Sequence, residues 1–243
     1  MSEVNNRLIK TDYILPSRSN WNAELSLSDS VDIFMDMAME HAELLGLGIT
    51  GFSPKHLFWV AAKTRIHFNR HIRMAENVSF LTWPQAPGRI KGDRQYAILN
   101  GEELLAYGKT EWVVISTDDK SIQKLDGIYP DDFLFCEDPG DSTEYERLRD
   151  FKDGEYFGEY KVRCVDIDYG LHMNNVAYVR AIEGLYTSKE WDEEDFSDFQ
   201  IDYKKSCYEG DTLIFTRRIE NGITYLRGAL SDGTTIVLCK LSR

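Results

Sequence analysis

The strongest constraint on the fold is a stretch of sequence that occurs twice along the chain. IHFNRHIRMAENVSFLT, beginning at Ile66, aligns without a gap with IDYKKSCYEGDTLIFTR, beginning at Ile201, an offset of 201 − 66 = 135. In this alignment Phe80 pairs with Phe215. Two half-buried strands share such a pattern in unrelated proteins, but here a helical pattern also precedes the strands in both halves. The sequence therefore favours a tandem repeat.

Each half has the pattern of one helix followed by several strands. In the first half, Ser26 and Asp29 have the spacing of a capping box, and the helix they begin is expected to stop at Gly46–Gly48. Its apolar stripe consists of Val31, Phe34, Met35, Ala38, Ala42 and Leu45. A second helix is expected after Asn174 or Asn175, with Val176, Val179, Ile182, Leu185 and Tyr186 on its apolar face.

Runs rich in aromatic and β-branched residues predict the strands. An Asn-Gly pair at Asn100 and Gly101 predicts a hairpin turn between two of them. A helix followed by antiparallel strands indicates an α+β fold in which the sheet curls over the helix. The expected strands cover residues 12–18, 56–68, 77–87, 92–100 and 103–117 in the first half, and 199–205, 211–219, 223–230 and 234–241 in the second.

An acidic segment separates the two halves. Residues 127–154 contain Pro, Gly and Ser among many carboxylates, which is typical of a linker. We therefore expect an N-terminal repeat over residues 1–126 and a C-terminal repeat over residues 155–243.

Composition excludes several classes of function. With 42% apolar and 12% aromatic residues, the 243-residue chain can form substantial cores. Its net charge of −13 disfavours general binding to nucleic acids or anionic membranes. An anionic carrier protein is still compatible, because it needs only a local basic patch.

The cysteines and the N-terminus indicate the compartment. The four cysteines are far apart and form no CxxC pair, and most lie in runs that look like strands, so reduced thiols and no structural metal are expected. The first residues resemble neither a signal peptide nor a transit peptide, and no apolar run reaches membrane-spanning length. We expect a cytoplasmic bacterial enzyme.

Polar groups that a fold alone does not require are concentrated between Val165 and Ser188. Asp166 and Asp168 follow a strand-like run, and their spacing of two predicts that they point to the same side. His172 follows across a turn at Gly170 and precedes the second helix. A carboxylate and an imidazole beside a helix N-terminus could support acyl transfer, because free backbone amides there can stabilise an oxyanion. Turn formation and helix capping are the structural alternative for the same residue types.

The spacing of this stretch resembles the DxDxNxHxNNxxY signature of the acyl-ACP thioesterases. The matching positions are Asp166, Asp168, Gly170, His172, Asn174, Asn175 and Tyr178, with Gly170 in place of the family's asparagine. The first half is also similar to the family in HAELLGLG, Trp59, the sequence Thr82 to Pro84, Arg94 within GDRQYAI, and TEWVVIS. The resemblance covers nearly the whole chain.

The resemblance implies a double hot-dog fold and hydrolysis of the thioester between a fatty acyl chain and acyl carrier protein, without a metal or organic cofactor. It implies catalytic positions at Asp168, His172 and Cys207. The family's acid before the cysteine is Ser206 here. Cys207 is then either the nucleophile or part of the pocket wall while water attacks. Hydrolysis of a thioester needs a base, an attacking group and hydrogen-bond donors for the oxyanion.

Further residues are expected around the substrate. Gly170, Asn174, Asn175 and Ser206 would lie near the reacting group. Met35 and Met39 of the first helix could line an acyl-chain tunnel, since methionine adapts to such chains. Arg65, Arg70, Lys204 and Lys205 could receive acyl carrier protein or its phosphopantetheine phosphate, although solvated strand faces explain such charges equally well. The protein is expected to be a monomer with an internal pseudo-dimer, or a homodimer.

Three other functions remain open at this stage. The chain could be an acyl-CoA thioesterase, a dehydratase or hydratase of the same fold, or a non-catalytic protein that binds an acyl chain or its carrier. The HMNN start of the second helix favours thioesterase over dehydratase. His41, His67 and His71 are expected to be structural.

Overall fold

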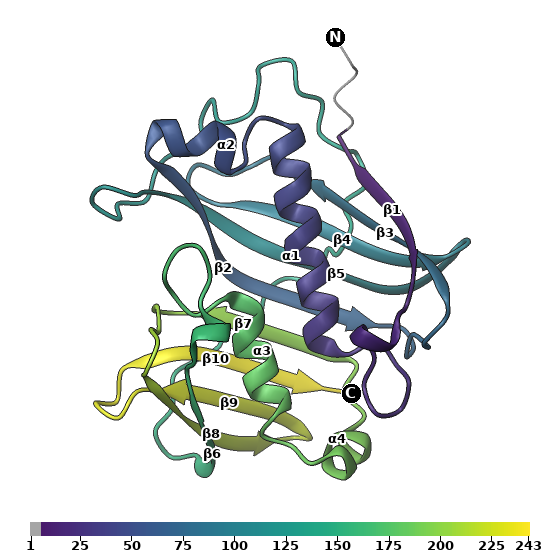
Figure 1. Cartoon of the computed structure of the whole chain (residues 1–243), viewed down its shortest axis with the longest axis vertical. Coiled ribbons are helices and arrows are strands. Elements are labelled where there is room, and N and C mark those ends of the chain that lie inside the picture. Colours follow the sequence, from purple (N-terminus) through teal and green to yellow (C-terminus); the bar gives the residue numbers. More distant parts are fainter. Residues whose placement is uncertain (1–5) are drawn as a thin grey trace. The chain divides into compact units, whose positions relative to one another are not determined.

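The computed structural model describes residues 6–243, which form two compact units (Figure 1). The first unit contains residues up to 25, 32–64 and 68–143. The second contains residues 26–31, 65–67 and 144–243. Two short segments of the first half of the sequence therefore group with the second unit.

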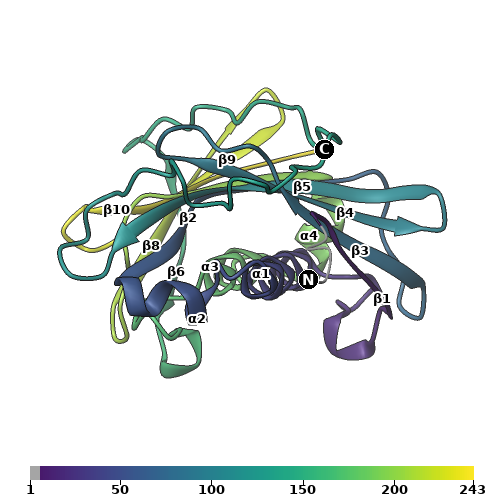
Figure 2. The ribbon, with the colours of Figure 1, turned by 90° about the horizontal axis from the view of Figure 1, so that it is seen from above.

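The strands of the first unit form an antiparallel sheet in the order β1-β3-β4-β5-β2. Seen from above, this sheet curves over the long helix α1 (Figure 2). A short helix and two single 3-10 turns complete the unit. The elements are β1 (Leu8–Tyr13), a 3-10 turn (Pro16–Arg18), α1 (Leu27–Leu44), α2 (Ile49–Phe52), a 3-10 turn (Ser53–Lys55), β2 (Leu57–Phe68), β3 (Asn77–Pro84), β4 (Gly92–Asn100) and β5 (Glu103–Ser116).

The second unit repeats this topology, with the strand order β6-β8-β9-β10-β7. β3 begins at Asn77 and β8 at Thr212, and 212 − 77 = 135 is the offset of the repeated sequence. The expected tandem repeat is confirmed. The elements are β6 (Glu155–Lys161), a 3-10 turn (Cys164–Asp166), α3 (Asn175–Glu183), α4 (Ser188–Glu194), β7 (Asp198–Tyr203), β8 (Thr212–Glu220), β9 (Ile223–Ala229) and β10 (Thr235–Ser242).

The side-chain cap predicted at Ser26 is present, as one half of a capping box. The Asp29 amide donates to the Ser26 hydroxyl at 3.0 Å, and the helix is followed by Gly46 with a φ of 70°. Phe34 packs flat on Tyr96 of β4, with ring centroids 4.4 Å apart, so this face of α1 covers the sheet. The buried stripe differs from the predicted one in that Met37 is buried while Met35 is only partly covered.

Helix α3 begins where Asn174 caps it, as the sequence predicts. The Asn174 side-chain oxygen accepts a hydrogen bond from the Val176 amide at 2.8 Å. At the other end of the helix, the partly buried carboxylate of Glu183 accepts hydrogen bonds from the amides of Leu27 at 3.0 Å and Ser28 at 3.3 Å. Leu27 and Ser28 are the first residues of α1. Glu183 therefore accepts hydrogen bonds from two amides in the first turn of α1 that have no partner within the helix.

The acidic segment 127–154 contains no helix or strand, yet it is attached along its length. The indole of Trp83 donates to the Asp138 carbonyl at 2.9 Å, and the Asp141 amide donates to the Gln95 side chain at 3.0 Å. Because Tyr96 faces α1, its neighbour Gln95 points to the opposite face of the sheet. This part of the segment therefore covers the outer face of the first unit's sheet.

Two local expectations were wrong, and one helix was not predicted. The first strand covers Leu8–Tyr13 rather than residues 12–18, because it is an exposed edge strand whose residues alternate little in polarity. Most cysteines do not lie in strands: Cys239 is on β10, while Cys136, Cys164 and Cys207 lie outside the strands. The chain also forms α4, which its sequence did not predict. None of the helices within residues 6–243 combines the length and the apolar character that crossing a bilayer requires.

Candidate active site

The loop from Asp166 to Asn174 folds back on itself just before α3. The Asn174 amide donates to the Asp166 carbonyl at 2.7 Å, and the Asp168 amide donates to the His172 carbonyl at 2.9 Å. Leu171 has a φ of 62°, the left-handed conformation that closes the turn. The turn thus holds Asp168 and His172 opposite each other.

The Asp168 carboxylate is bound to the backbone of this turn. Its Oδ1 accepts a hydrogen bond from the Gly170 amide at 2.8 Å and lies 3.5 Å from the His172 amide nitrogen. Within residues 6–243 it forms no hydrogen bond with the His172 imidazole. Asp168 therefore positions His172 through the backbone of the loop. The ring nitrogens of His172 remain available to bind another group.

Gly170 opens the space that the two side chains share. A Cβ at this position would lie 3.1 Å from Asp168 Oδ1 and 3.3 Å from His172 Nδ1. The positive φ in this turn occurs at Leu171, and Gly170 itself has no positive φ. Gly170 is therefore needed for room rather than for backbone conformation, and a side chain here would press on both functional groups.

The imidazole of His172 also contacts an aromatic ring from a second loop. Its ring centroid lies 5.2 Å from that of Tyr208, at an angle of 48°. The loop after β7 is joined to the first one by the Met173 amide, which donates to the Cys207 carbonyl at 2.8 Å. Tyr208 was not predicted from the sequence, and an aromatic residue directly after Cys207 was the only available signal.

Asp166 does not share this space, which corrects the expectation that both aspartates point to the same side. Its carboxylate is buried and accepts hydrogen bonds from the Tyr160 hydroxyl at 2.8 Å and the Arg163 amide at 2.7 Å. These bonds hold the 3-10 turn that precedes the loop. Asp166 is structural in this arrangement.

The first turn of α3 offers one free backbone donor. The side chain of Asn174 is used by the Val176 amide, and the Asn175 carbonyl lies 3.3 Å from the Tyr203 hydroxyl that donates to it. The Asn175 amide donates no hydrogen bond within the described part of the chain. A helix N-terminus with a free amide can bind an oxyanion.

Cys207 lies in the loop after β7, not on a strand. Its thiol is buried, and Sγ lies 3.5 Å from Asp211 Oδ2. Burial, and then the charge of Asp211, raise the pKa of the thiol to about 12. The thiol is therefore protonated at neutral pH, whereas the preceding Ser206 is exposed.

Tyr178, the last residue of the signature, lies beneath this loop on α3. Burial raises the pKa of its hydroxyl, and nearby Cys207 and Asp168 raise it further. Tyr178 thus stays protonated among acidic groups and can donate a hydrogen bond.

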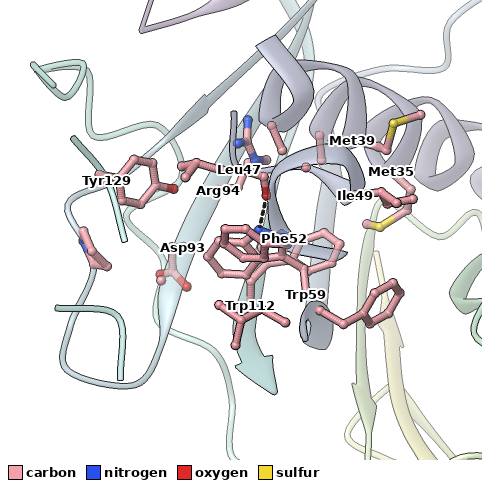
Figure 3. A pocket seen from close by; sticks show the side chains of 17 residues that line it. Met35, Met39, Leu47, Ile49, Phe52, Trp59, Asp93, Arg94, Trp112 and Tyr129 are labelled. Atoms are coloured by element: carbon pink, nitrogen blue, oxygen red, sulfur yellow. Dashed lines mark hydrogen bonds between the residues drawn. The ribbon is translucent and has the colours of Figure 1, made fainter. Parts of the chain in front are cut away.

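The first unit contains a cavity of about 180 Å³ between α1, α2 and the sheet (Figure 3). Both methionines named from the sequence, Met35 and Met39, are part of its wall, and Met39 is half exposed at the surface. Trp59, whose indole donates to the Leu47 carbonyl at 2.9 Å, forms another side. The cavity is mostly apolar, and its lining is completed by Ala38, Ala42, Gly48, Ile49, Phe52, Leu57, Phe58, Pro87, Gly92, Asp93, Arg94, Trp112 and Tyr129.

The cations considered for carrier docking have internal partners in most cases. Arg65 is buried and forms an ion pair with Asp198, which removes its charge from the surface. Arg70 binds the carboxylates of Glu76 and Glu103, each within 2.9 Å. Lys204 pairs with Asp202 at 2.8 Å, while Lys205 is exposed.

The repeated helix within a curved antiparallel sheet defines the class of the protein as the double hot-dog fold. Two family models match the chain: the acyl-ACP thioesterase N-terminal domain over residues 7–131 and the acyl-ACP thioesterase C-terminal domain over residues 150–234. The chain therefore belongs to the acyl-ACP thioesterase family.

Solved structures agree with this assignment of the fold. An acyl-ACP thioesterase from Bacteroides thetaiotaomicron superposes with a TM-score of 0.88 at 19% identity, covering 100% of this chain and 99% of that one. The 12:0-ACP thioesterase from Umbellularia californica gives a TM-score of 0.83 at 17% identity, covering 98% and 97%.

Curated relatives are similar at low identity. Oleoyl-acyl carrier protein thioesterase 1 of Arabidopsis thaliana is 23% identical over 231 residues, which is 88% of this chain and 64% of the relative. The palmitoyl-acyl carrier protein thioesterase of Cuphea hookeriana is 22% identical over 200 residues, covering 75% of this chain and 47% of the relative. The chain thus spans less than two thirds of the length of these plant proteins.

Proposed function

We propose that the protein hydrolyses the thioester between a fatty acyl chain and acyl carrier protein, releasing a free fatty acid. One observation supports this most directly: Asp168 and His172 face one space above Gly170, beside the N-terminus of α3. The family membership supplies the substrate class. An acyl-CoA thioester is the alternative substrate.

In this proposal a water molecule attacks the thioester carbonyl. His172 accepts its proton as general base, because its ring is partly exposed and is not hydrogen-bonded to Asp168. The developing oxyanion is stabilised by the free Asn175 amide and the positive end of α3. The proton then passes from His172 to the leaving thiolate as the tetrahedral intermediate collapses.

Water is preferred over Cys207 as the nucleophile. A thiol acts as a nucleophile only as its thiolate. The raised pKa of Cys207 makes the thiolate scarce at neutral pH, because burial, and then the negative charge of Asp211, disfavour the charged form. Cys207 then serves the site by joining its loop to Met173 through its backbone carbonyl.

The two units take different roles in the proposal. The second unit carries out the hydrolysis, and the apolar cavity of the first unit receives the acyl chain. Acyl carrier protein is the partner, and exposed Lys205, together with Lys204, is the remaining candidate for contact with its phosphopantetheine phosphate.

The test is release of fatty acid from a panel of purified acyl-carrier-protein and acyl-CoA thioesters of different chain length. The proposal predicts turnover with carrier substrates that His172→Ala abolishes. A well-folded protein that binds acyl carriers without hydrolysing any of them would instead be a non-catalytic binder. Faster turnover of the CoA thioesters would change the substrate class.

A further inference from the structure

The turn that carries Tyr208 is closed by Asp211, the residue directly before β8. The Asp211 amide donates to the Tyr208 carbonyl at 3.1 Å, and Asp211 Oδ2 accepts a hydrogen bond from the Tyr208 amide at 2.9 Å. The same oxygen lies 3.5 Å from Cys207 Sγ. The turn is also attached to the residue after β6, because the Val162 amide donates to the Asp211 carbonyl at 2.9 Å. One carboxylate oxygen therefore contacts two neighbouring residues of the turn.

The first repeat contains the same turn, closed by Glu76. The Glu76 amide donates to the Arg73 carbonyl at 3.2 Å, and Glu76 Oε1 accepts a hydrogen bond from the Arg73 amide at 2.7 Å. The positions correspond to Tyr208 and Asp211 at the offset of the repeat, since 208 − 73 = 135 and 211 − 76 = 135. A carboxylate that closes this turn is therefore a feature of the repeated fold, and the first repeat provides an internal comparison.

The two carboxylates differ in their charged partners. The guanidinium of Arg70 donates to both oxygens of Glu76 at 2.8 Å, and these bonds lower the pKa of Glu76 to about 2. The residue equivalent to Arg70 is Lys205, whose side chain is exposed. Within residues 6–243 Asp211 forms no ion pair with it or with any other cation. A cation thus neutralises the carboxylate of this turn in the first repeat only.

The group beside the carboxylate differs as well. The first repeat has the buried, apolar Ile72 at the position equivalent to Cys207. In the second repeat the charge of Asp211 adds to burial in raising the pKa of the Cys207 thiol. The turn also carries the ring of Tyr208, which lies 5.2 Å from the imidazole of His172. Asp211 is therefore connected to two groups of the candidate site.

We propose that Asp211 is a positioning residue of this site: its carboxylate holds the Tyr208 ring against His172 through the Tyr208 amide, and its charge keeps the Cys207 thiol unreactive. The first task needs a hydrogen-bond acceptor, whereas the second needs a negative charge. Substitutions can therefore separate them. The inference rests on the proposed function, because it takes His172 as the base.

Steady-state kinetics test the first task. Asp211→Ala removes the acceptor and should lower kcat to the level of Tyr208→Ala, by up to about tenfold, with KM nearly unchanged. The double variant should be no slower than either single variant, because both changes remove one contact. Asp211→Asn retains an acceptor for the Tyr208 amide and should restore most of the lost kcat.

Nuclear magnetic resonance tests the same task without a substrate. The imidazole signals of His172 are those absent from His172→Ala, and a neighbouring aromatic ring displaces them. Asp211→Ala and Tyr208→Ala should move these signals in the same way, while Asp211→Asn should leave them near their native positions. If the native protein hydrolyses no thioester, the proposed function fails, and these signals still decide whether Asp211 positions Tyr208.

Alkylation of Cys207 by iodoacetamide tests the second task. Asp211→Asn removes the negative charge, so the thiolate should be more abundant and alkylation at pH 8 about threefold to tenfold faster than in the native protein. Reaction of the exposed Cys164 gives the reference rate. Hydrogen exchange of the Met173 amide, which is bonded to the Cys207 carbonyl, reports opening of the loop. An equal rise in exchange and alkylation would assign the effect to access and overturn the role of the charge.

Glu76→Gln is the matched control, because it removes the charge of the equivalent carboxylate in the first repeat. It should leave kcat, the His172 signals and the alkylation of Cys207 unchanged. The inference is overturned by native kcat and native His172 signals in a folded Asp211→Ala protein, by native alkylation in Asp211→Asn, or by the same effects in Glu76→Gln. If Asp211→Ala does not fold, Asp211→Val, which also lacks an acceptor and suits a position beside a strand, takes its place.

Discussion

The imidazole of His172 rests against the ring of Tyr208, with 5.2 Å between the ring centroids. Tyr208 is 52% exposed, so the contact lies at the surface. An aromatic contact of this kind is worth about 0.5–1.5 kcal/mol, enough to favour one orientation of the imidazole by up to about tenfold.

Tyr208→Ala should therefore lower kcat by up to about tenfold while leaving KM nearly unchanged. Tyr208→Phe retains the ring and should behave as the native protein does. Steady-state hydrolysis of an acyl-carrier substrate measures both. Equal losses in the two variants would assign the effect to the hydroxyl group rather than to the ring contact.

Asp168 and His172 should act as one unit. Asn at position 168 retains an acceptor for the Gly170 amide, so Asp168→Asn should preserve the turn and remove only the charge. The charge of Asp168 would stabilise the imidazolium that forms when His172 accepts a proton. We therefore expect His172→Ala and Asp168→Asn to lower kcat by about 100-fold or more each, and the double variant to cost little beyond His172→Ala. Losses that multiply in the double variant would indicate independent roles.

Cys207→Ala should retain kcat within about threefold, since water is the proposed nucleophile. A pKa raised to about 12 leaves the thiol protonated below that pH, so alkylation by iodoacetamide should be slow at pH 8 and accelerate as the pH rises towards 12. Mass spectrometry of the alkylated protein measures this. Exposed Cys164 is the internal control that should react first. Loss of turnover in a folded Cys207→Ala protein would restore the covalent mechanism.

Gly170→Asn restores the residue that the family signature has at this position. The backbone permits it, but its Cβ would crowd Asp168 and His172, and we expect a stability cost of about 1 kcal/mol. Gly170→Ala adds the same Cβ without the amide. If an amide there assists the oxyanion, kcat of the Asn variant should exceed that of the Ala variant by about tenfold or more. Equal rates would show that another donor already fills this role.

Met35→Ala should shift the product profile towards longer acyl chains, because Met35 is a partly buried part of the cavity wall. Met39→Ala should have a smaller effect, since that side chain is 50% exposed. Met37→Ala is the matched control: Met37 is buried elsewhere in the core, so its loss should cost about 2–5 kcal/mol of stability without changing the profile. A profile unchanged by all three substitutions would place the end of the acyl chain outside this wall.

Local patterns predicted the fold well where they carried strong signals. The strand from Gly92 to Asn100 and the start of the next at Glu103 follow from alternating apolar residues on either side of an Asn-Gly turn. The helix caps at Ser26 and Asn174 were equally accessible, because a cap depends on residues within one turn. The edge strand β1 and the polar helix α4 lack an apolar face, so periodicity could not reveal them.

The parts of the site that escaped prediction depend on contacts between distant residues. Arg65 looked like a surface cation because its partner Asp198 lies 133 positions further along the chain. The environment of Cys207 depends on Asp211 across a turn, and that of His172 on Tyr208 from another loop. Spacing along the sequence can identify candidate residues, but it does not show which groups they meet.

The short segments 26–31 and 65–67 come from the first half of the sequence but belong to the second unit, so the second unit cannot be cut out as one continuous fragment. A fragment beginning at residue 144 would have all strands of the second repeat but not the amides of Leu27 and Ser28 that bind Glu183, nor the Arg65 that binds Asp198. Two partly buried carboxylates would lose these partners. The boundary between the two units therefore does not coincide with a single point in the sequence, and a chimaera that swaps the C-terminal repeat between relatives must carry these nine residues with it.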